Sequence, residues 1–232
     1  MNIRTVILLV FYILLVIAVI PVLLICFVLG VREPLLGIGR WAMRVSRGLL
    51  GIHVDVVGLD QAKTNRPAVY MANHSSLLDG PLLFILIPRP PRIIIKAGVF
   101  RLPIVGWGMK YVGFVPVDRR GARAGRAAID RAARLMREKG YSFLIFPEGT
   151  RSRDNRLQSF RRGGFFLALA AEAPIIPVTI QGTYALMPKG VSAPKRGSVR
   201  VIFHPAVSVE GRRPEDMADL MEAVRARIAD SN

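Results

Sequence analysis

Hydrophobic and polar positions follow two different patterns along the chain, and the change between them falls near residue 50. Residues 6–31 carry no charge, and about 26 residues at 1.5 Å per residue make a helix of roughly 39 Å, long enough to cross a bilayer. After Gly51, short apolar runs alternate with helical segments, which is typical of an α/β domain. We therefore expect membrane-anchoring helices over residues 1–50 and an α/β domain over residues 51–232.

Residues 34–52 combine apolar side chains with arginines at helical spacing, namely Arg40, Arg44 and Arg47. With Trp41 as a headgroup-level anchor, this pattern predicts a helix in the membrane interface. Two arrangements remain open, because the first helix either spans the bilayer or dips into it and returns through the second. In both, the basic cluster outweighs Arg4, so the positive-inside rule predicts that the domain lies on the cytoplasmic face of the cell (inner) membrane.

Seven apolar runs in the second part predict strands, at 52–57, 67–72, 91–96, 112–117, 141–146, 174–180 and 198–204. Several are continuously apolar, as strands buried on both faces are. Helical spacing predicts helices at 78–86, 99–111, 122–139, 163–172 and 214–229, and residues 188–197 are typical of a loop. The expected fold class is α/β, with a largely parallel central sheet flanked by helices.

The charge balance narrows the class of partner. The chain has 33 lysines and arginines against 16 acidic residues, a formal net charge of +17, which predicts an anionic partner. Nucleic acid and an acidic membrane surface both fit, but 52% hydrophobic residues and a mean hydropathy of +0.38 favour the membrane. We expect no nucleic acid as partner, because the arginine-rich helix predicted at 122–139 lacks interleaved aromatic residues and no nucleic-acid-binding motif occurs. We also expect no metal site, because no cysteine pair, H-E-x-x-H sequence or carboxylate cluster occurs.

Polar sequences follow three of the predicted strands at the point where each strand ends. NHSSLLD follows Ala72, DRR follows Val117, and PEGTRSR follows Phe146. Because the carboxyl ends of parallel strands meet at one edge of a sheet, we expect the three sequences to lie together there, where open α/β sheets bind ligands.

His74 and Asp79 stand at H-x4-D spacing in the first of these sequences. A helix that begins just after His74 places Asp79 in its first turns, close enough to face the imidazole. The carboxylate would fix the tautomer and stabilise the imidazolium, which makes His74 a candidate general base for a hydroxyl. The alternative is a histidine incidental to a helix cap. We expect backbone amides at the start of this helix to stabilise an oxyanion.

The third sequence suits a phosphate. Gly149 permits close approach of the backbone, Thr150 supplies a hydroxyl, and Arg151 presents a planar fork for bidentate binding. Glu148 would orient Arg151 or accept from a substrate hydroxyl. Neighbouring strand ends would complete this pocket with Arg119 and Lys96. A purely structural turn is the alternative.

Taken in order, these sequences resemble the conserved blocks of the glycerophospholipid acyltransferase family, and most of all its lysophosphatidate-acylating members. NHSSLLD resembles the first block, N-H-x4-D; GFVPVDRR resembles the second; FPEGTRSR resembles the third; and IIPVTI resembles the fourth. The resemblance covers roughly residues 68–183, and the apolar amino terminus also fits the family. One departure is the sequence KAGV at 96–99, where the family frequently reads K-x-E-L.

The resemblance implies a role for each matching residue. His74 is the implied catalytic base and Asp79 its partner. Pro177 and Val178 are implied to shape the acyl site, and Lys96 falls where the family often has a lysine. The implied ligands of the glycerol phosphate are Arg119, Glu148, Gly149, Thr150 and Arg151.

By the same resemblance, the reaction moves a fatty acyl group to the sn-2 hydroxyl of lysophosphatidate and gives phosphatidate for phospholipid synthesis. The implied donor is a thioester of acyl carrier protein or of coenzyme A, which acts as co-substrate, and no other cofactor is implied. Other lysophospholipids or a lyso-ornithine lipid remain open as acceptors. A non-catalytic module that binds anionic lipid is a further alternative, for which His74→Ala would be harmless.

Overall fold

The structure is a computed structural model that describes residues 3–118, 121–191 and 193–230. Within these residues seven strands form one sheet, in the order β1-β7-β6-β2-β5-β3-β4. The strands are β1 Ile52–Val57, β2 Val69–Ala72, β3 Arg92–Lys96, β4 Val115–Val117, β5 Phe143–Ile145, β6 Ile175–Gln181 and β7 Gly197–Phe203. The α/β fold class expected from the sequence is confirmed.

The central part of the sheet is parallel. β2 pairs in parallel with β5 and β6, and β3 pairs in parallel with β4 and β5. β7 runs antiparallel to β6, and β1 pairs in parallel with β7, so the last two strands at this side of the sheet, β7 and β1, point the opposite way. The carboxyl ends of β2 to β6 therefore meet at one edge of the sheet.

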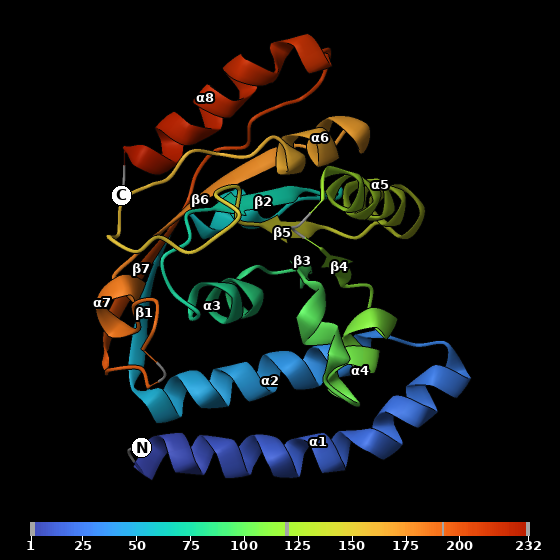
Figure 1. The fold of residues 1–232 in the computed structure, drawn as a ribbon, viewed down its shortest axis with the longest axis vertical. Helices are drawn as coiled ribbons and strands as arrows, with labels where there is room; N and C mark the ends of the chain where they lie inside the picture. The colour runs from blue at the N-terminus through green and yellow to red at the C-terminus, as the bar shows by residue number, and fades with distance from the viewer. Residues whose placement is uncertain (1–2, 119–120, 192, 231–232) are drawn as a thin grey trace.

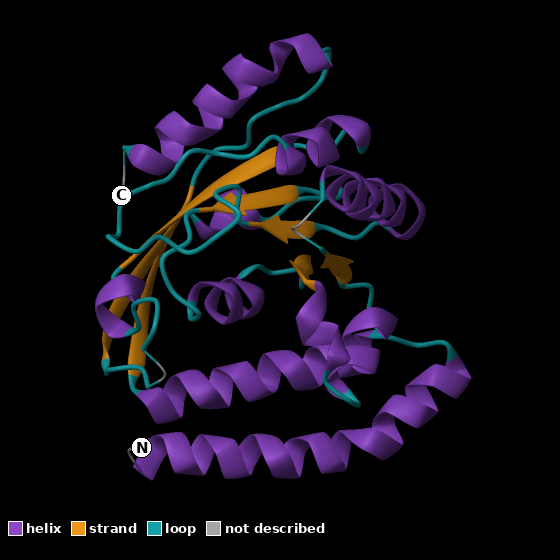
Figure 2. Cartoon of the chain, viewed as in Figure 1, coloured by secondary structure: helices purple, strands orange, loops and turns teal. Residues whose placement is uncertain are grey.

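Helices cover both faces of this sheet (Figures 1 and 2). One face packs on α5, α6 and α8, and the other packs on α3, with α2 and then α1 lying beyond it (Figure 1). The α-helices are α1 Ile3–Leu29, α2 Glu33–Leu50, α3 Asp79–Leu86, α4 Val105–Tyr111, α5 Ala122–Lys139, α6 Gly163–Ala170, α7 Thr183–Leu186 and α8 Met217–Ala229. The described 3-10 helices are η1 Leu59–Ala62, η2 Ala97–Arg101 and η3 Pro214–Asp216.

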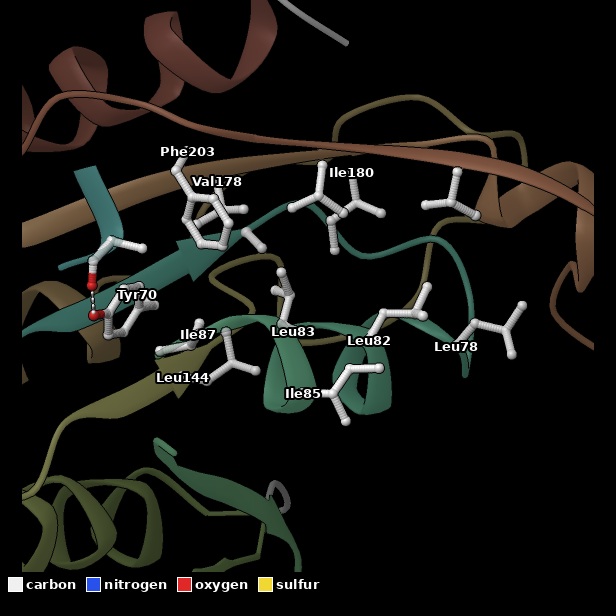
Figure 3. Close-up of a cluster of buried hydrophobic side chains, with 14 of the residues drawn as sticks. Tyr70, Leu78, Leu82, Leu83, Ile85, Ile87, Leu144, Val178, Ile180 and Phe203 are labelled. Atoms are coloured by element: carbon white, nitrogen blue, oxygen red, sulfur yellow. Dashed lines mark hydrogen bonds between the residues drawn. The ribbon is translucent and has the colours of Figure 1, made fainter. Parts of the chain in front are cut away.

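The core between the sheet and α3 is built from strand side chains on one face and helix side chains on the other. Figure 3 shows Leu82 and Leu83 of α3 against Val178 of β6 and Phe203 of β7. At one end Tyr70 is almost fully buried, and its hydroxyl donates to the carbonyl of Ala62 at 2.7 Å. This packing holds the start of α3, and with it Asp79, in a fixed place at the sheet edge.

The first two helices form an antiparallel pair that lies side by side in Figure 1. Tyr12 and Ser46 share a hydrogen bond of 2.8 Å between their hydroxyls, and the ring centroids of Phe11 and Trp41 are 5.7 Å apart. Among the described residues, α1 is the one helix long and apolar enough to cross a membrane, and its apolar stretch is not buried in the molecule. The division of the chain at residue 50 stays a prediction.

Some predicted elements differ from the observed ones for local reasons. The helix expected over 99–111 is two elements, η2 and α4, because Pro103 lies between them and proline interrupts helical hydrogen bonding. The strand expected from residue 112 begins at Val115, because Val112 still closes α4 and Gly113 has φ +95°. The short helix α7 follows β6 directly, in a region where no helix was expected.

Candidate functional site

Loops from three parallel strands converge at the carboxyl edge of the sheet. The backbone N–H of Ser152, after β5, donates to the carbonyl of His74, after β2, at 2.8 Å. The Ser75 and Thr183 hydroxyls share a hydrogen bond of 3.2 Å, which ties in the loop after β6. The first and third polar sequences are therefore in direct contact, as the strand directions predicted.

His74 and Asp79 form a hydrogen-bonded pair, with 2.8 Å between the imidazole Nδ1 and the carboxylate Oδ2. Asp79 is fully buried at the first position of α3, where the partial positive charge of the helix terminus favours a carboxylate. Because an ionised carboxylate only accepts, the imidazole proton lies on Nδ1 and the lone pair on Nε2. Among the described residues nothing hydrogen-bonds to Nε2, so this nitrogen is available to take a proton.

The amides of Ser75 and Ser76 both donate to Asp79 Oδ2, each at 2.8 Å. They stabilise the carboxylate and hold it against the imidazole. These two amides are therefore engaged inside the loop, and the expectation that amides just after His74 stabilise an oxyanion does not hold for them.

The orientation of the imidazole ring is set by stacking. Phe146, directly after β5, lies parallel to the His74 ring with centroids 4.0 Å apart and planes inclined by 17°. The His74 side chain is 18% exposed, whereas the Asp79 side chain is not exposed at all. The ring is thus held by its carboxylate and by Phe146, and it stays accessible from the site.

Glu148 links the first and third polar sequences. Its Oε1 accepts from the backbone N–H of His74 at 2.6 Å, and its Oε2 accepts from the N–H of Gln158 at 3.0 Å. Burial raises the pKa of this carboxyl, and the two amide hydrogen bonds oppose that rise. Glu148 therefore positions the backbone of His74. Its predicted contact with substrate stays a prediction.

Gly149 makes a turn that other residues adopt only with strain. Its φ is +73°, and its N–H donates to the carbonyl of Phe146 at 3.0 Å. A Cβ built here would lie 2.8 Å from Nε of Arg161. The glycine therefore permits both the turn and the close approach of this arginine.

The remaining candidate ligands occupy different surroundings. Thr150 lies 3.5 Å from the Lys189 ammonium, hydroxyl oxygen to Nζ, and Arg151 is half-buried. Lys96 is exposed at the end of β3. Arg119 lies outside the described residues. Pro177 and Val178 are buried in β6, in register with Met71 and Ala72 of β2. Their roles in binding substrate stay predictions.

A cavity of about 570 Å³ opens next to the histidine, between the ends of β3, β4 and β5 and the helices α5 and α6. One wall is apolar and includes Phe146, whose ring stacks on His74. The apolar wall is formed by Ile94, Val117, Ile129, Ile145, Phe146 and Phe166. Cationic side chains from two places in the chain also line it, Arg126 of α5 and the adjacent pair Arg161 and Arg162.

The sequence interpretation missed Arg161 and Arg162, and it gave Arg126 no part in the site. A pair of arginines directly before two glycines, in the sequence FRRGG, was the available signal. That signal is weak without a fold, because only the packing of α6 on α5 turns these residues towards the cavity.

Comparison with known proteins agrees with this geometry. A family model described as Acyltransferase matches residues 53–181, more than half of the chain. The chain is 32% identical over 190 residues to a 1-acyl-sn-glycerol-3-phosphate acyltransferase of Borreliella burgdorferi, which covers 82% of this chain and 75% of that protein. It is 36% identical over 180 residues to the chloroplastic 1-acyl-sn-glycerol-3-phosphate acyltransferase LPAT1 of Arabidopsis thaliana, covering 77% of this chain and 49% of that protein.

The fold has a counterpart among solved structures. The crystal structure of the 1-acyl-sn-glycerophosphate acyltransferase PlsC from Thermotoga maritima superposes with a TM-score of 0.70 at 29% identity, covering 86% of this chain and 81% of that one. The chain spans about half the length of its relatives from Arabidopsis, Brassica and Chlamydomonas. The matching family model, the Borreliella relative and the shared fold show that this chain belongs to the acyltransferase family.

Proposed function

We propose that the chain transfers a fatty acyl group from an acyl thioester to the sn-2 hydroxyl of lysophosphatidate, which gives phosphatidate. The names of the relatives support this reaction, since those from Borreliella, Arabidopsis and Thermotoga all denote acylation of the same lysolipid. The observation that carries the proposal is the His74–Asp79 pair, with Nδ1 bound to the carboxylate and Nε2 open to the site.

In the proposed reaction the acceptor hydroxyl attacks the thioester carbonyl carbon while His74 Nε2 takes the hydroxyl proton. The new ester C–O bond forms, the C–S bond breaks, and the imidazolium returns the proton to the departing sulfur. Asp79 stabilises the imidazolium between these two steps. The protein forms no covalent acyl intermediate in this scheme.

The phosphate of the acceptor needs cationic and hydroxyl groups within reach of His74. Arg151 and Thr150 lie on the loop whose residue Ser152 bonds to the His74 carbonyl, and Lys189 lies beside Thr150. Together with Arg119, they are the residues that we assign to the phosphate. The apolar wall of the cavity suits a fatty acyl chain, and its arginines suit the anionic part of a ligand.

The donor belongs to the proposal in two forms, a thioester of acyl carrier protein or of coenzyme A. The phosphates of coenzyme A and an acidic carrier protein are both attracted by a net charge of +17.

We place the enzyme at the cell (inner) membrane, with its site on the cytoplasmic face. The apolar helix α1 and the basic residues of α2 support this location.

A panel of substrates tests the proposal. Purified chain in detergent micelles is given palmitoyl-coenzyme A or palmitoyl-acyl carrier protein with lysophosphatidate, lysophosphatidylcholine, lysophosphatidylethanolamine or a lyso-ornithine lipid, and products are identified by mass spectrometry. We expect phosphatidate to form fastest. The other acceptors are included because the sequence KAGV at 96–99 departs from the K-x-E-L that is frequent in the resembled family. Faster acylation of another acceptor would replace lysophosphatidate, and no acylation at all would favour the lipid-binding module.

A further inference from the structure

We infer that the turn between η2 and α4 is a second lipid contact, separate from α1 and α2, which inserts Leu102, Val105 and Trp107 into the interface of an anionic bilayer. We call residues 101–107 the tip. Trp107 is 68% exposed and Leu102 is 53% exposed, although both are large apolar side chains. Neighbouring exposed groups of this size mark surfaces that bind another apolar phase.

Local packing and hydrogen bonding fix the backbone of the tip with these side chains on the outside. Phe100, directly before it, is buried in a cluster with Leu36 of α2 and Phe84 of α3. The Gly106 N–H donates to the Leu102 carbonyl at 2.8 Å, and a Cβ on Gly106 would lie 2.2 Å from the Phe100 carbonyl oxygen. The backbone is therefore closed tightly on itself, with Phe100 inside and the apolar residues of the tip outside.

The backbone of the tip also contains a strained conformation. Ile104 has φ +62° and ψ −60°, and a positive φ is rare for a β-branched residue. Such strain costs on the order of 1–3 kcal/mol and tends to occur where a segment has a function beyond packing. Here the bend at Ile104 lies between the exposed side chains of Leu102 and Val105.

The helix α4, whose first residues belong to the tip, contacts the apolar end of α1 through its last residue, Tyr111. The Tyr111 hydroxyl, at the end of α4, donates to the Val31 carbonyl at 2.9 Å, and its ring lies 5.8 Å from that of Phe27. Figure 1 shows α4 beside the ends of α1 and α2 that meet at their connecting turn. The exposed apolar residues at that end of α1 are Leu24, Ile25, Phe27, Val28 and Leu29.

The charges around the tip select a lipid surface as its partner. Residues 96–117 contain Lys96, Arg101 and Lys110 and no acidic residue. The guanidinium of Arg32 lies over the Tyr111 ring. Glu33, the acidic residue at the start of α2, forms an ion pair with Arg92. An exposed tryptophan among apolar side chains, flanked by cations, is the composition of a segment that sits at the headgroup level of anionic bilayers.

This contact would bring the bilayer to the edge of the site. The exposed Lys96, which ends β3 at the ligand-binding edge, is joined to the tip by η2 alone. A lysolipid that leaves the bilayer at the tip therefore has a short path to the carboxyl ends of the strands. This consequence rests on the proposed function, whereas the lipid contact itself does not.

Fluorescence of Trp107 tests the contact without any turnover. The chain has two tryptophans, so Trp41→Phe leaves Trp107 as the sole emitter in the full-length protein. The protein is bound to vesicles of phosphatidylglycerol and phosphatidylethanolamine, with or without bromine on acyl-chain carbons near the headgroup. We expect Trp107 emission to shift to the blue and to fall roughly twofold in the brominated vesicles, as an interfacial tryptophan would.

The matched control moves the tryptophan to the far side of the molecule. Ala226 is exposed on α8, which covers the opposite face of the sheet from α1 (Figure 1). The variant with Trp41→Phe, Trp107→Phe and Ala226→Trp should bind the same vesicles and show no quenching. Equal, unquenched emission from Trp107 and from the control, on protein that sediments with the vesicles, would overturn the inference. A dimer that Leu102→Ser dissociates, with Trp107 unquenched, would also overturn it and assign the tip to a second copy.

A second variant separates the lipid contact from catalysis. Leu102→Ser with Trp107→Ser should lower acylation of lysophosphatidate in vesicles by about tenfold and leave turnover in detergent micelles unchanged. Unchanged turnover in both media would count against the contact. If the unaltered chain shows no acylation of lysophosphatidate in either medium, the proposed function is overturned. The quenching result alone then decides whether the tip contacts lipid.

Discussion

At the scale of single residues, the proposed chemistry depends on which nitrogen of His74 keeps its proton. The buried Asp79 carboxylate accepts from Nδ1 and from two backbone amides, all on the same oxygen, Oδ2. The other oxygen, Oδ1, is buried and has no hydrogen-bond partner in the described part of the chain. The hydrogen bond from Nδ1 to this carboxylate fixes the tautomer in which Nε2 carries no proton.

Asp79→Asn tests whether the carboxylate fixes the tautomer of His74. An amide in place of the carboxylate can present N–H to Nδ1, which favours the wrong tautomer and removes the charge that stabilises imidazolium. We expect kcat to fall about 10³- to 10⁴-fold with little change in the KM for lysophosphatidate. Steady-state kinetics of this variant beside Asp219→Asn, an exposed aspartate on α8, provides the comparison. A fall in kcat of less than tenfold would remove Asp79 from the mechanism.

Glu148 predicts a particular dependence of stability on pH. Burial raises its pKa in the folded protein, so the folded state keeps the proton at pH values where the unfolded state releases it. The contribution of this group to stability is therefore full below the ordinary pKa of a glutamate and is lost as pH rises through its raised folded-state pKa. Thermal unfolding of the native chain over that window should show this fall.

The variant Glu148→Gln should flatten that dependence. Its side-chain N–H₂ would face one of the two backbone amides that the carboxylate now accepts, so we also expect a loss of roughly 1–3 kcal/mol of folding free energy. Glu138→Gln, at an exposed position of α5, is the matched control. A stability profile in the Glu148 variant that keeps the same slope as the native chain would rule out this source.

At the scale of elements, the helix α2 and the helix α3 are joined by a specific contact. Arg40 of α2 donates from Nη1 to the Pro88 carbonyl and from Nη2 to the Ile85 carbonyl, at 2.9 and 2.8 Å. These carbonyls lie at the end of α3, where a cation opposes the negative end of the helix dipole. The helix that begins with Asp79 is therefore fixed at its other end by a residue from α2.

Arg40→Ala should uncouple these elements. We expect a loss of about 1–3 kcal/mol in unfolding free energy, because two carbonyls lose charged donors. Arg44→Ala, an exposed arginine one turn further along α2, should change stability by less than about 0.5 kcal/mol. Denaturant unfolding in detergent compares the two, and equal effects would show that the contact of Arg40 with α3 does not contribute.

The sequence predicted the elements with strong local patterns and missed those that depend on tertiary contacts. The run at 174–180 and the helix at 122–139 are close to β6 and α5, because their hydrophobic spacing is continuous. The reversed direction of β1 and β7 has no local signal, since pairing is decided by the whole sheet. The pairing of His74 with Asp79 was predictable from their spacing together with their place directly after a predicted strand, whereas the position of Arg161 depends on the packing of α6 and on the turn at Gly149.

At the scale of the whole molecule, the apolar surface and the candidate catalytic groups lie at opposite ends of one ordered arrangement. The helix α1 and the tip give the apolar side, α2 and α3 connect that side to the sheet, and the strand ends carry His74 beside the cavity (Figure 1). In the proposed reaction, an acceptor held by its chain in lipid and a donor from solution would meet at Nε2 of His74. The basic charge of the chain favours both anionic ligands.

The central claim is that Nε2 of His74 takes the acceptor proton, and one kinetic comparison tests it most directly. Acyl transfer to lysophosphatidate is measured for the native chain, for His74→Gln and for His53→Gln, which replaces an exposed histidine of β1. We predict that His74→Gln lowers kcat about 10²- to 10⁴-fold with an unchanged KM for the acceptor, while His53→Gln matches the native chain. Native kcat in the His74 variant, or a loss confined to KM, would contradict the account.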